Sequence, residues 1–191
     1  YLAYSLLGDY YKNKNCYSIA IKYYKEVVKI NQKFSDVYLN LALCFFETEE
    51  FDYALLSLNQ YEELSQTSDY VYYLKARIAL ALCKYNDAER YITQALEMCS
   101  KDEYHFELGK IYYSLENYAA ALDIFQNLLR NKDSAEIFNY VGLCNSKMKN
   151  IELAIANFNK AIQLDGLRPI YYYNLAQCYK SLNDKKNYVK Y

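Results

Sequence analysis

Apolar and small residues recur along the chain at spacings of three and four, which is the spacing of one face of an α-helix. Residues 1–34 hold two such stripes, separated by the polar pair Lys14 and Asn15. The residues of these stripes, at positions 4, 7, 8, 11, 20, 24 and 27, are Tyr4, Leu7, Gly8, Tyr11, Ala20, Tyr24 and Val27. The pattern predicts two antiparallel helices joined by a tight turn.

The same offsets return at intervals of 33 or 34 residues, which predicts an array of repeats. The predicted repeats are 1–34, 35–68, 69–101, 102–134, 135–168 and a partial sixth repeat, 169–191. In such an array each repeat contacts mainly its neighbours, so no repeat has a core of its own. We therefore expect a single continuous array over residues 1–191 and no separate domains.

Positions within each repeat are numbered here as in the first one, and two of them always carry small residues. Position 8 holds Gly8, Ala42, Ala76, Gly109, Gly142 and Ala176. Position 20 is alanine in the first five repeats, at Ala20, Ala54, Ala88, Ala121 and Ala154. Small residues at both positions let the two helices approach closely, while bulky apolar residues at position 24 fill the remaining space. A larger residue at Ala54 or Gly109 is expected to overpack this contact, at a cost of roughly 1–3 kcal/mol.

The pattern resembles the tetratricopeptide repeat family, in which an aromatic residue, Leu-Gly, Tyr, Ala and further apolar positions recur in about 34 residues. The resemblance covers essentially the whole chain and implies an all-α fold, a right-handed α-solenoid of antiparallel helix pairs. Some positions depart from the family pattern. Position 4 carries Tyr, His or Phe in place of Trp, and Pro169 is the chain's only proline. Lys75 and Asn145 are polar at positions that are usually apolar.

Composition limits the kinds of partner. A net charge of −1 and a pI near 6.0 give no general basic footprint, so we expect no nucleic-acid binding. No run of 18 apolar residues exists, so no membrane span is expected. Three of the six cysteines share position 10, at Cys44, Cys144 and Cys178, and no Cys-x-x-Cys pair occurs. We interpret the cysteines as reduced thiols that pack as small hydrophobes, which favours a cytoplasmic location.

The residues give little support for chemistry. The one histidine, His105, occupies the ring-bearing position 4 and has no partner at a metal-ligand or catalytic spacing, so we expect it to be packed in the core. The four glycines are dispersed and form no phosphate loop. We therefore predict that the segment is not an enzyme and uses no catalytic residues, cofactor or metal.

What remains is a surface. The family resemblance implies that positions 2, 5, 9, 12 and 13 of each first helix line a concave groove. At these positions the middle of the chain carries Leu39, Leu43, Phe46, Tyr70, Tyr73, Arg77, Leu80, Phe106, Lys110 and Tyr113. Two interpretations are open: these side chains pack against the adjacent repeat or another part of the protein, or they bind an extended peptide or helix of a partner protein. In the second case Arg77 and Lys110 favour partners that carry acidic groups.

A carboxylate clamp, as in chaperone-binding arrays of this family, is not expected. Such a clamp places Lys, Arg and Asn at fixed positions of three successive repeats. Counted from the first repeat, the residues at those positions are Ser5, Asp9, Asn40, Tyr70 and Leu74. Counted from the second repeat, they are Leu39, Leu43, Leu74, Glu103 and Glu107. A C-terminal carboxylate would meet acidic side chains instead of cations.

We therefore predict a scaffold for protein–protein interaction. Two alternatives remain: a substrate-recruiting arm of a larger enzyme whose catalytic domain lies outside the segment, and a module for homo-oligomerisation. The chain begins without Met and its last repeat is incomplete, so we expect it to be a piece of a longer protein. The sequence predicts neither the oligomeric state nor the identity of the partner.

Overall fold

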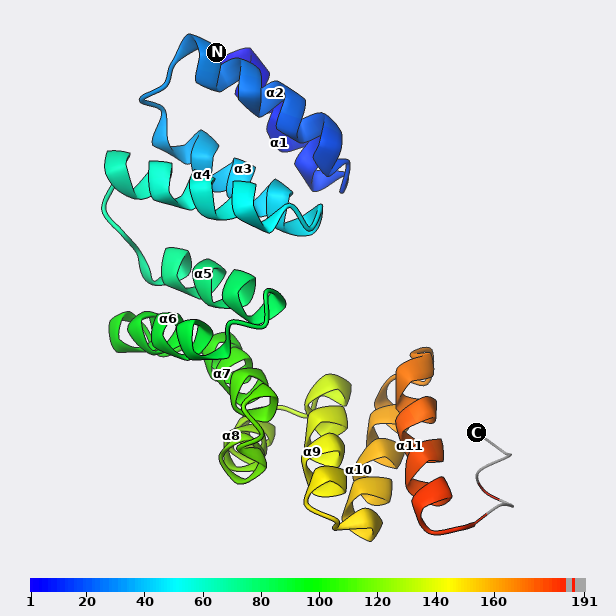
Figure 1. The fold of residues 1–191 in the computed structure, drawn as a ribbon. Helices are drawn as coiled ribbons and strands as arrows, with labels where there is room; N and C mark the ends of the chain where they lie inside the picture. Colours follow the sequence, from blue (N-terminus) through cyan, green and yellow to red (C-terminus); the bar gives the residue numbers. More distant parts are fainter. Residues whose placement is uncertain (185–186, 188–191) are drawn as a thin grey trace. The chain divides into compact units, whose positions relative to one another are not determined.

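The computed structural model describes residues 1–184 and 187, and this part of the chain is built of α-helices joined by short loops (Figure 1). The helices are α1 (Leu2–Asn13), α2 (Tyr17–Ile30), α3 (Ser35–Glu47), α4 (Phe51–Leu64), α5 (Asp69–Ala81), α6 (Tyr85–Met98), α7 (Asp102–Ser114), α8 (Tyr118–Asn131), α9 (Ala135–Lys147), α10 (Ile151–Leu164) and α11 (Pro169–Ser181).

Consecutive helices form antiparallel pairs, from α1 with α2 to α9 with α10, and each pair lies within one predicted repeat. The all-α fold class, a solenoid of helix pairs, is confirmed. The first helix of the sixth repeat is α11. The second helix expected there falls on residues 185–191, which, apart from residue 187, lie outside the described residues.

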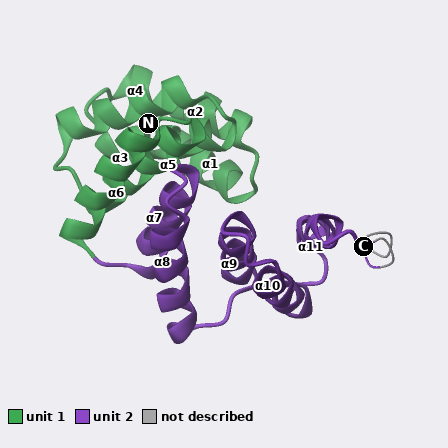
Figure 2. Ribbon diagram, turned by 60° about the horizontal axis from the view of Figure 1, so that its bottom comes forward, with its two compact units in different colours: residues 1–99 green, residues 100–191 purple. Residues whose placement is uncertain are grey.

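The chain divides into two compact units, residues 1–99 and 100–191 (Figure 2). Unit 1 contains α1 to α6 and unit 2 contains α7 to α11. The boundary lies next to the junction of the third and fourth predicted repeats. Each unit is described below by itself, and a single array over the whole chain stays a prediction.

In three helix pairs, glycine at position 8 of the first helix packs tightly against an aromatic ring at position 24 of the second. A Cβ atom added to Gly109 would lie 2.6 Å from Cε1 of Phe125, a ring that is fully buried. The same arrangement occurs at Gly142 with Phe158 and at Gly8 with Tyr24. These distances are well inside van der Waals contact, so only glycine fits beneath an aromatic ring here.

Two other repeats have alanine in place of glycine at position 8. In these repeats position 24 carries an aliphatic residue, which is smaller than the aromatic ring found opposite glycine. The pairs are Ala42 with Leu58 and Ala76 with Ile92, and all four residues are buried. A methyl group gained on the first helix is thus matched by a smaller side chain on the second. The volume shared by the two positions stays nearly constant, as close packing requires.

The tight turn predicted at positions 14–16 is present in every repeat, and it has a common geometry. Position 15 adopts the left-handed conformation, with φ between 56° and 67°, at Asn15, Glu49, Cys83, Glu116, Lys149 and Asn183. The next N–H donates to the carbonyl five residues before it, as from Glu50 to Phe45 (2.8 Å). This is the Schellman motif that ends many helices, usually with glycine at the left-handed position. Here no repeat uses glycine.

The two polar residues at usually apolar positions are satisfied inside the structure. Lys75 is nearly buried, and its Nζ lies 2.5 Å from Oε2 of Glu62 on the preceding helix, α4. Asn145 donates from Nδ2 to the carbonyl of Val141 (2.9 Å), one turn earlier on α9. Both departures from the family pattern are therefore compatible with burial, because neither residue has a buried polar atom without a hydrogen-bond partner.

We expect Gly109→Ala to destabilise the protein. Helix propensity alone favours alanine by about 1 kcal/mol, whereas overpacking costs about 1–3 kcal/mol, and the buried Phe125 ring cannot move away. The free energy of unfolding in urea should fall, and the loss should be smaller when Phe125→Leu is already present. Additive effects of the two substitutions would show that the contact is not the cause.

We expect Lys149→Gly to stabilise the protein by up to about 1 kcal/mol, because glycine adopts the left-handed conformation without the steric cost of a Cβ atom. The matched control is Ala156→Gly, at an exposed position inside α10, which should destabilise by about 1 kcal/mol. The comparison is made by thermal and urea unfolding. Effects of the same sign at both sites would contradict the assigned turn geometry.

Candidate partner-binding surfaces

The nine residues predicted to bind a partner lie on first helices and are all partly buried. In unit 1 they form what we call the unit 1 surface: Leu39, Leu43 and Phe46 on α3, and Tyr70, Tyr73 and Arg77 on α5. In unit 2 they form the unit 2 surface: Phe106, Lys110 and Tyr113 on α7. The apolar members of the unit 1 surface also pack against the core of their unit. Each of these side chains therefore has one part in contact with the core and another part exposed to solvent.

Arg77 is the centre of the unit 1 surface. Its guanidinium carbon lies 4.3 Å from the centre of the Phe46 ring and 5.6 Å from that of Tyr73, whose ring is 5.9 Å from Tyr70. Helices α3 and α5 therefore bring together residues 27 to 31 positions apart in the sequence. Cation–π contacts of this kind contribute about 0.5–1 kcal/mol at exposed sites and restrict the guanidinium. Across residues 1–184 and 187, no hydrogen bond or ion pair joins Arg77 to a carboxylate.

Unit 1 also contains a network of polar side chains that bind one another. Asp9 Oδ1 accepts a hydrogen bond from the Tyr24 hydroxyl (2.7 Å) and a longer one from Asn40 Nδ2 (3.3 Å). Lys12 Nζ donates to Asn40 Oδ1 (2.6 Å) and lies 3.6 Å from Asp9. Burial, and then the bond to Asp9, raise the pKa of Tyr24. Sequence reasoning considered Asp9 and Asn40 only as possible ligand-binding positions and missed this network, although Asp9 and Lys12 have the i, i+3 spacing of a helical ion pair.

Lys110 in unit 2 differs from Arg77 because its charge is paired. Its Nζ lies 2.9 Å from Oε2 of Glu107, a nearly buried carboxylate one turn earlier on α7, and 5.6 Å from the Phe106 ring centre. The charge of Lys110 thus compensates a buried anion of the same helix. It offers less attraction to an acidic partner than Arg77 does.

The two aromatic members of the unit 2 surface pack around Tyr140 of α9. The ring centres of Phe106 and Tyr113 lie 5.5 and 6.1 Å from that of Tyr140, which stacks on Phe125 at 5.2 Å. Burial raises the pKa of Tyr140 to about 12, with a further contribution from Glu136. These ring contacts connect one repeat to the next, as the packing interpretation expects, and the role of the two rings in binding a partner stays a prediction.

The structure offers limited material for chemistry. His105 is half-buried at the surface of its helix pair rather than packed in the core, and its Nε2 lies 2.9 Å from Oγ of Ser100. Within the described residues no three His, Cys, Asp or Glu side chains gather as metal ligands do.

None of the described helices is both long and apolar enough to span a membrane. Cys44, Cys144 and Cys178 are buried, and burial raises the pKa of Cys44 to about 11 and that of Cys144 to about 12.

Comparison with known families gives three matches. Residues 73–136 and 135–166 match two models described as tetratricopeptide repeat, and residues 13–95 match the model of anaphase-promoting complex, cyclosome, subunit 3. A curated relative, the TPR repeat-containing protein MJ1428 of Methanocaldococcus jannaschii, is 25% identical over 156 residues. The aligned region covers 76% of this chain and 28% of that relative, so the chain spans only about a quarter of its length.

Solved structures share the fold at low sequence identity. PilW, a type IV pilus biogenesis factor, superposes with a TM-score of 0.85 (14% identity; 98% of this chain, 88% of the other). A chain of the APC/C hetero-tetramer Cut9-Hcn1 gives 0.80 (21% identity; 96% and 37%). YrrB, described as a TPR protein with an unusual peptide-binding site, gives 0.69 (16% identity; 89% of each chain). Likeness at this level of identity concerns the fold alone.

We expect only Cys16, Cys83 and Cys99 to react with a maleimide in the native protein at pH 8, because these three are at least partly exposed. The buried thiols are enclosed, and those of Cys44 and Cys144 stay protonated far above that pH because their pKa values are raised. Mass spectrometry should detect six labels after unfolding in urea. Native labelling of Cys44, Cys144 or Cys178 at a comparable rate would contradict the assigned burial.

Proposed function

The chain belongs to the tetratricopeptide repeat family, whose fold is a scaffold for protein–protein interaction, and we propose that its unit 1 surface binds a peptide or helix of a partner protein. The partner segment carries acidic side chains next to apolar ones. The acidic groups meet Arg77, and the apolar groups meet the rings of Phe46 and Tyr73. The proposed place of binding is the concave groove that the family resemblance implies.

One observation carries this proposal: Arg77 contacts the rings of Phe46 and Tyr73 and has no carboxylate partner among the described residues. Arg90 differs from Arg77 in this respect. Its guanidinium also lies over a ring, that of Tyr91 at 4.7 Å, but it forms an ion pair with Asp87 at 2.9 Å. A restricted, unpaired guanidinium loses little side-chain entropy when it binds a carboxylate. Arginine and tyrosine are also among the residues that most often dominate binding energy at interfaces.

The partner segment is not expected to bind through its C-terminus. Asp9 occupies a position where a carboxylate clamp has asparagine, and this carboxylate would repel a terminal carboxylate. YrrB, which shares the fold and is described as having an unusual peptide-binding site, supports peptide recognition on this fold in general terms. We therefore propose an internal segment of the partner as the ligand, bound by shape, apolar contacts and one or more acidic side chains.

Selection of a random peptide display library on the full chain tests the proposal. We expect enriched peptides to place Asp or Glu beside apolar residues. Their affinity should fall at least about tenfold in Arg77→Met, which keeps much of the apolar contact but removes the charge, as expected for a charge-assisted hydrogen bond of about 1.5–3 kcal/mol. Isothermal titration of two selected peptides measures the change.

Arg90→Met is the matched control, because it removes a stacked arginine outside the unit 1 surface. It should leave the affinity unchanged, and both variants should stay folded, with thermal unfolding midpoints within about 4 °C of the parent because each loses only about 1 kcal/mol of surface contacts. Equal losses in the two variants, or none in Arg77→Met, would remove the unit 1 surface from the proposal. Loss of binding when the peptide C-terminus is amidated would indicate a carboxylate clamp instead.

A further inference from the structure

Unit 2 contains a pocket where α7, α8 and α9 meet, separate from the residues used in the proposed function. Its volume is about 230 Å³. Phe106 of α7, Leu128 of α8 and Ile137 of α9 supply apolar walls. Small-molecule sites usually measure about 300–1,000 Å³, so this pocket has room for one side chain and not for a cofactor.

Two carboxylates at this pocket lack a partner. Glu103 and Glu136 both line it, and within the described part of the chain neither makes a hydrogen bond or an ion pair. Asp102 also lines it but is held by Asn131, whose Nδ2 lies 3.3 Å from Asp102 Oδ2. Asp102, Glu103 and Glu136 are exposed, and the apolar walls of Phe106, Leu128 and Ile137 give the pocket a second property besides its charge.

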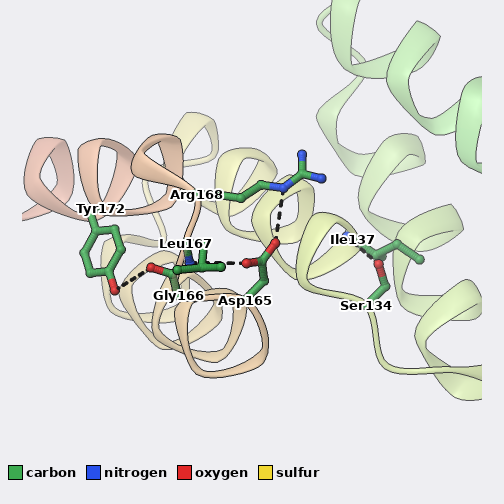
Figure 3. A network of polar contacts seen from close by, with 7 residues as sticks. All are labelled: Ser134, Ile137, Asp165, Gly166, Leu167, Arg168 and Tyr172. Carbon is green, nitrogen blue, oxygen red and sulfur yellow. Dashed lines mark hydrogen bonds and ion pairs between the residues drawn. The ribbon is translucent and has the colours of Figure 1, made fainter. Parts of the chain in front are cut away.

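The positive charges nearby do not cancel these acids. Lys132 lines the pocket and offsets one carboxylate, while the N-termini of α7 and α9 contribute about half a positive charge each. Arg168 forms an ion pair with Asp165, whose Oδ2 lies 3.2 Å from Arg168 Nε (Figure 3). The pocket therefore retains roughly one net negative charge, which a single cation would neutralise.

Glu136 is also not needed to cap its own helix. The side chain of Ser134 already accepts a hydrogen bond from the backbone N–H of Ile137 (3.5 Å), as Figure 3 shows. Ser134 is therefore the N-cap residue of α9, and Glu136 is not needed as an acceptor for the first N–H groups of the helix. The carboxylate of Glu136 is thus available for a ligand.

We propose that this pocket receives a lysine or arginine side chain from a partner protein. The methylene stem lies on Phe106, Leu128 and Ile137, and the cationic end reaches Glu103 and Glu136. Long basic side chains combine these two properties, an apolar stem and a charged tip. The proposal concerns only unit 2 and does not rest on the role proposed for Arg77.

The test is a methyl NMR titration of the full chain labelled at isoleucine with acetyl-Ala-Ala-Arg-Ala-Ala-amide. The Ile137 methyl signal should shift and saturate at millimolar peptide, while that of Ile92, which is fully buried in unit 1, should stay in place. The same peptide with citrulline keeps the shape of arginine without its charge. It should bind up to about fivefold more weakly, as for loss of an exposed ion pair.

The double variant Glu103→Gln, Glu136→Gln should weaken arginine-peptide binding by about fivefold or more, because both carboxylates line the pocket. The matched control is Glu152→Gln, an exposed first-turn acid of α10 outside the pocket, which should have no effect. No shift of Ile137 up to about 20 mM peptide, which corresponds to less than about 2.4 kcal/mol of binding, would overturn the proposal. Equal binding of the citrulline peptide, or unchanged binding in the double variant, would overturn it as well.

Discussion

The contact between positions 8 and 24 is the constraint on which the helix pairs depend. In three repeats it brings the backbone of the first helix against an aromatic ring, and in two others a buried alanine at position 8 is matched by a smaller buried side chain at position 24. This contact sets how closely the two helices approach, and therefore which positions point to the core. The positions left over, among them 5, 9 and 12, carry most of the residues predicted to bind a partner. The location of the candidate binding surfaces thus follows from how the two helices of each pair pack.

Most of the fold could be predicted from the sequence because helical spacing identifies the buried face without knowledge of distant contacts. The tight turns were also predictable from the polar residues at positions 14–16. Other features depend on pairing between side chains that no local pattern specifies. The bond from Asn40 to Asp9 joins residues 31 positions apart, and Lys75 reaches Glu62 across a loop. The division after residue 99 had no signal in the repeat spacing, which runs through it with one residue missing.

The candidate site was predicted less completely, since a residue's position on a helix does not say whether its charge is free. Arg77 and Lys110 occupy the same position of successive repeats and were assigned the same role. Glu107 pairs with Lys110, whereas Arg77 stacks on Phe46 without an acidic partner among the described residues. The difference follows from a glutamate three residues before the lysine, where the third repeat carries Leu74. We therefore expect the attraction of each candidate surface for an acidic ligand to depend on charges that are not paired within the chain, and less on the number of charged residues.

The turns carry a consequence for how the protein can change over generations. Each turn keeps a side chain at a position where glycine would relieve the backbone, and these exposed residues include carboxylates at Glu49 and Glu116, a thiol at Cys83 and an ammonium at Lys149. The hydrogen bonds that form the turn come from the backbone, so the identity of this side chain is of little importance to the turn. One edge of the repeats can therefore gain, lose or reverse charge by single substitutions while the helix pairs stay intact. Selection can adjust that edge for new encounters at little risk to folding.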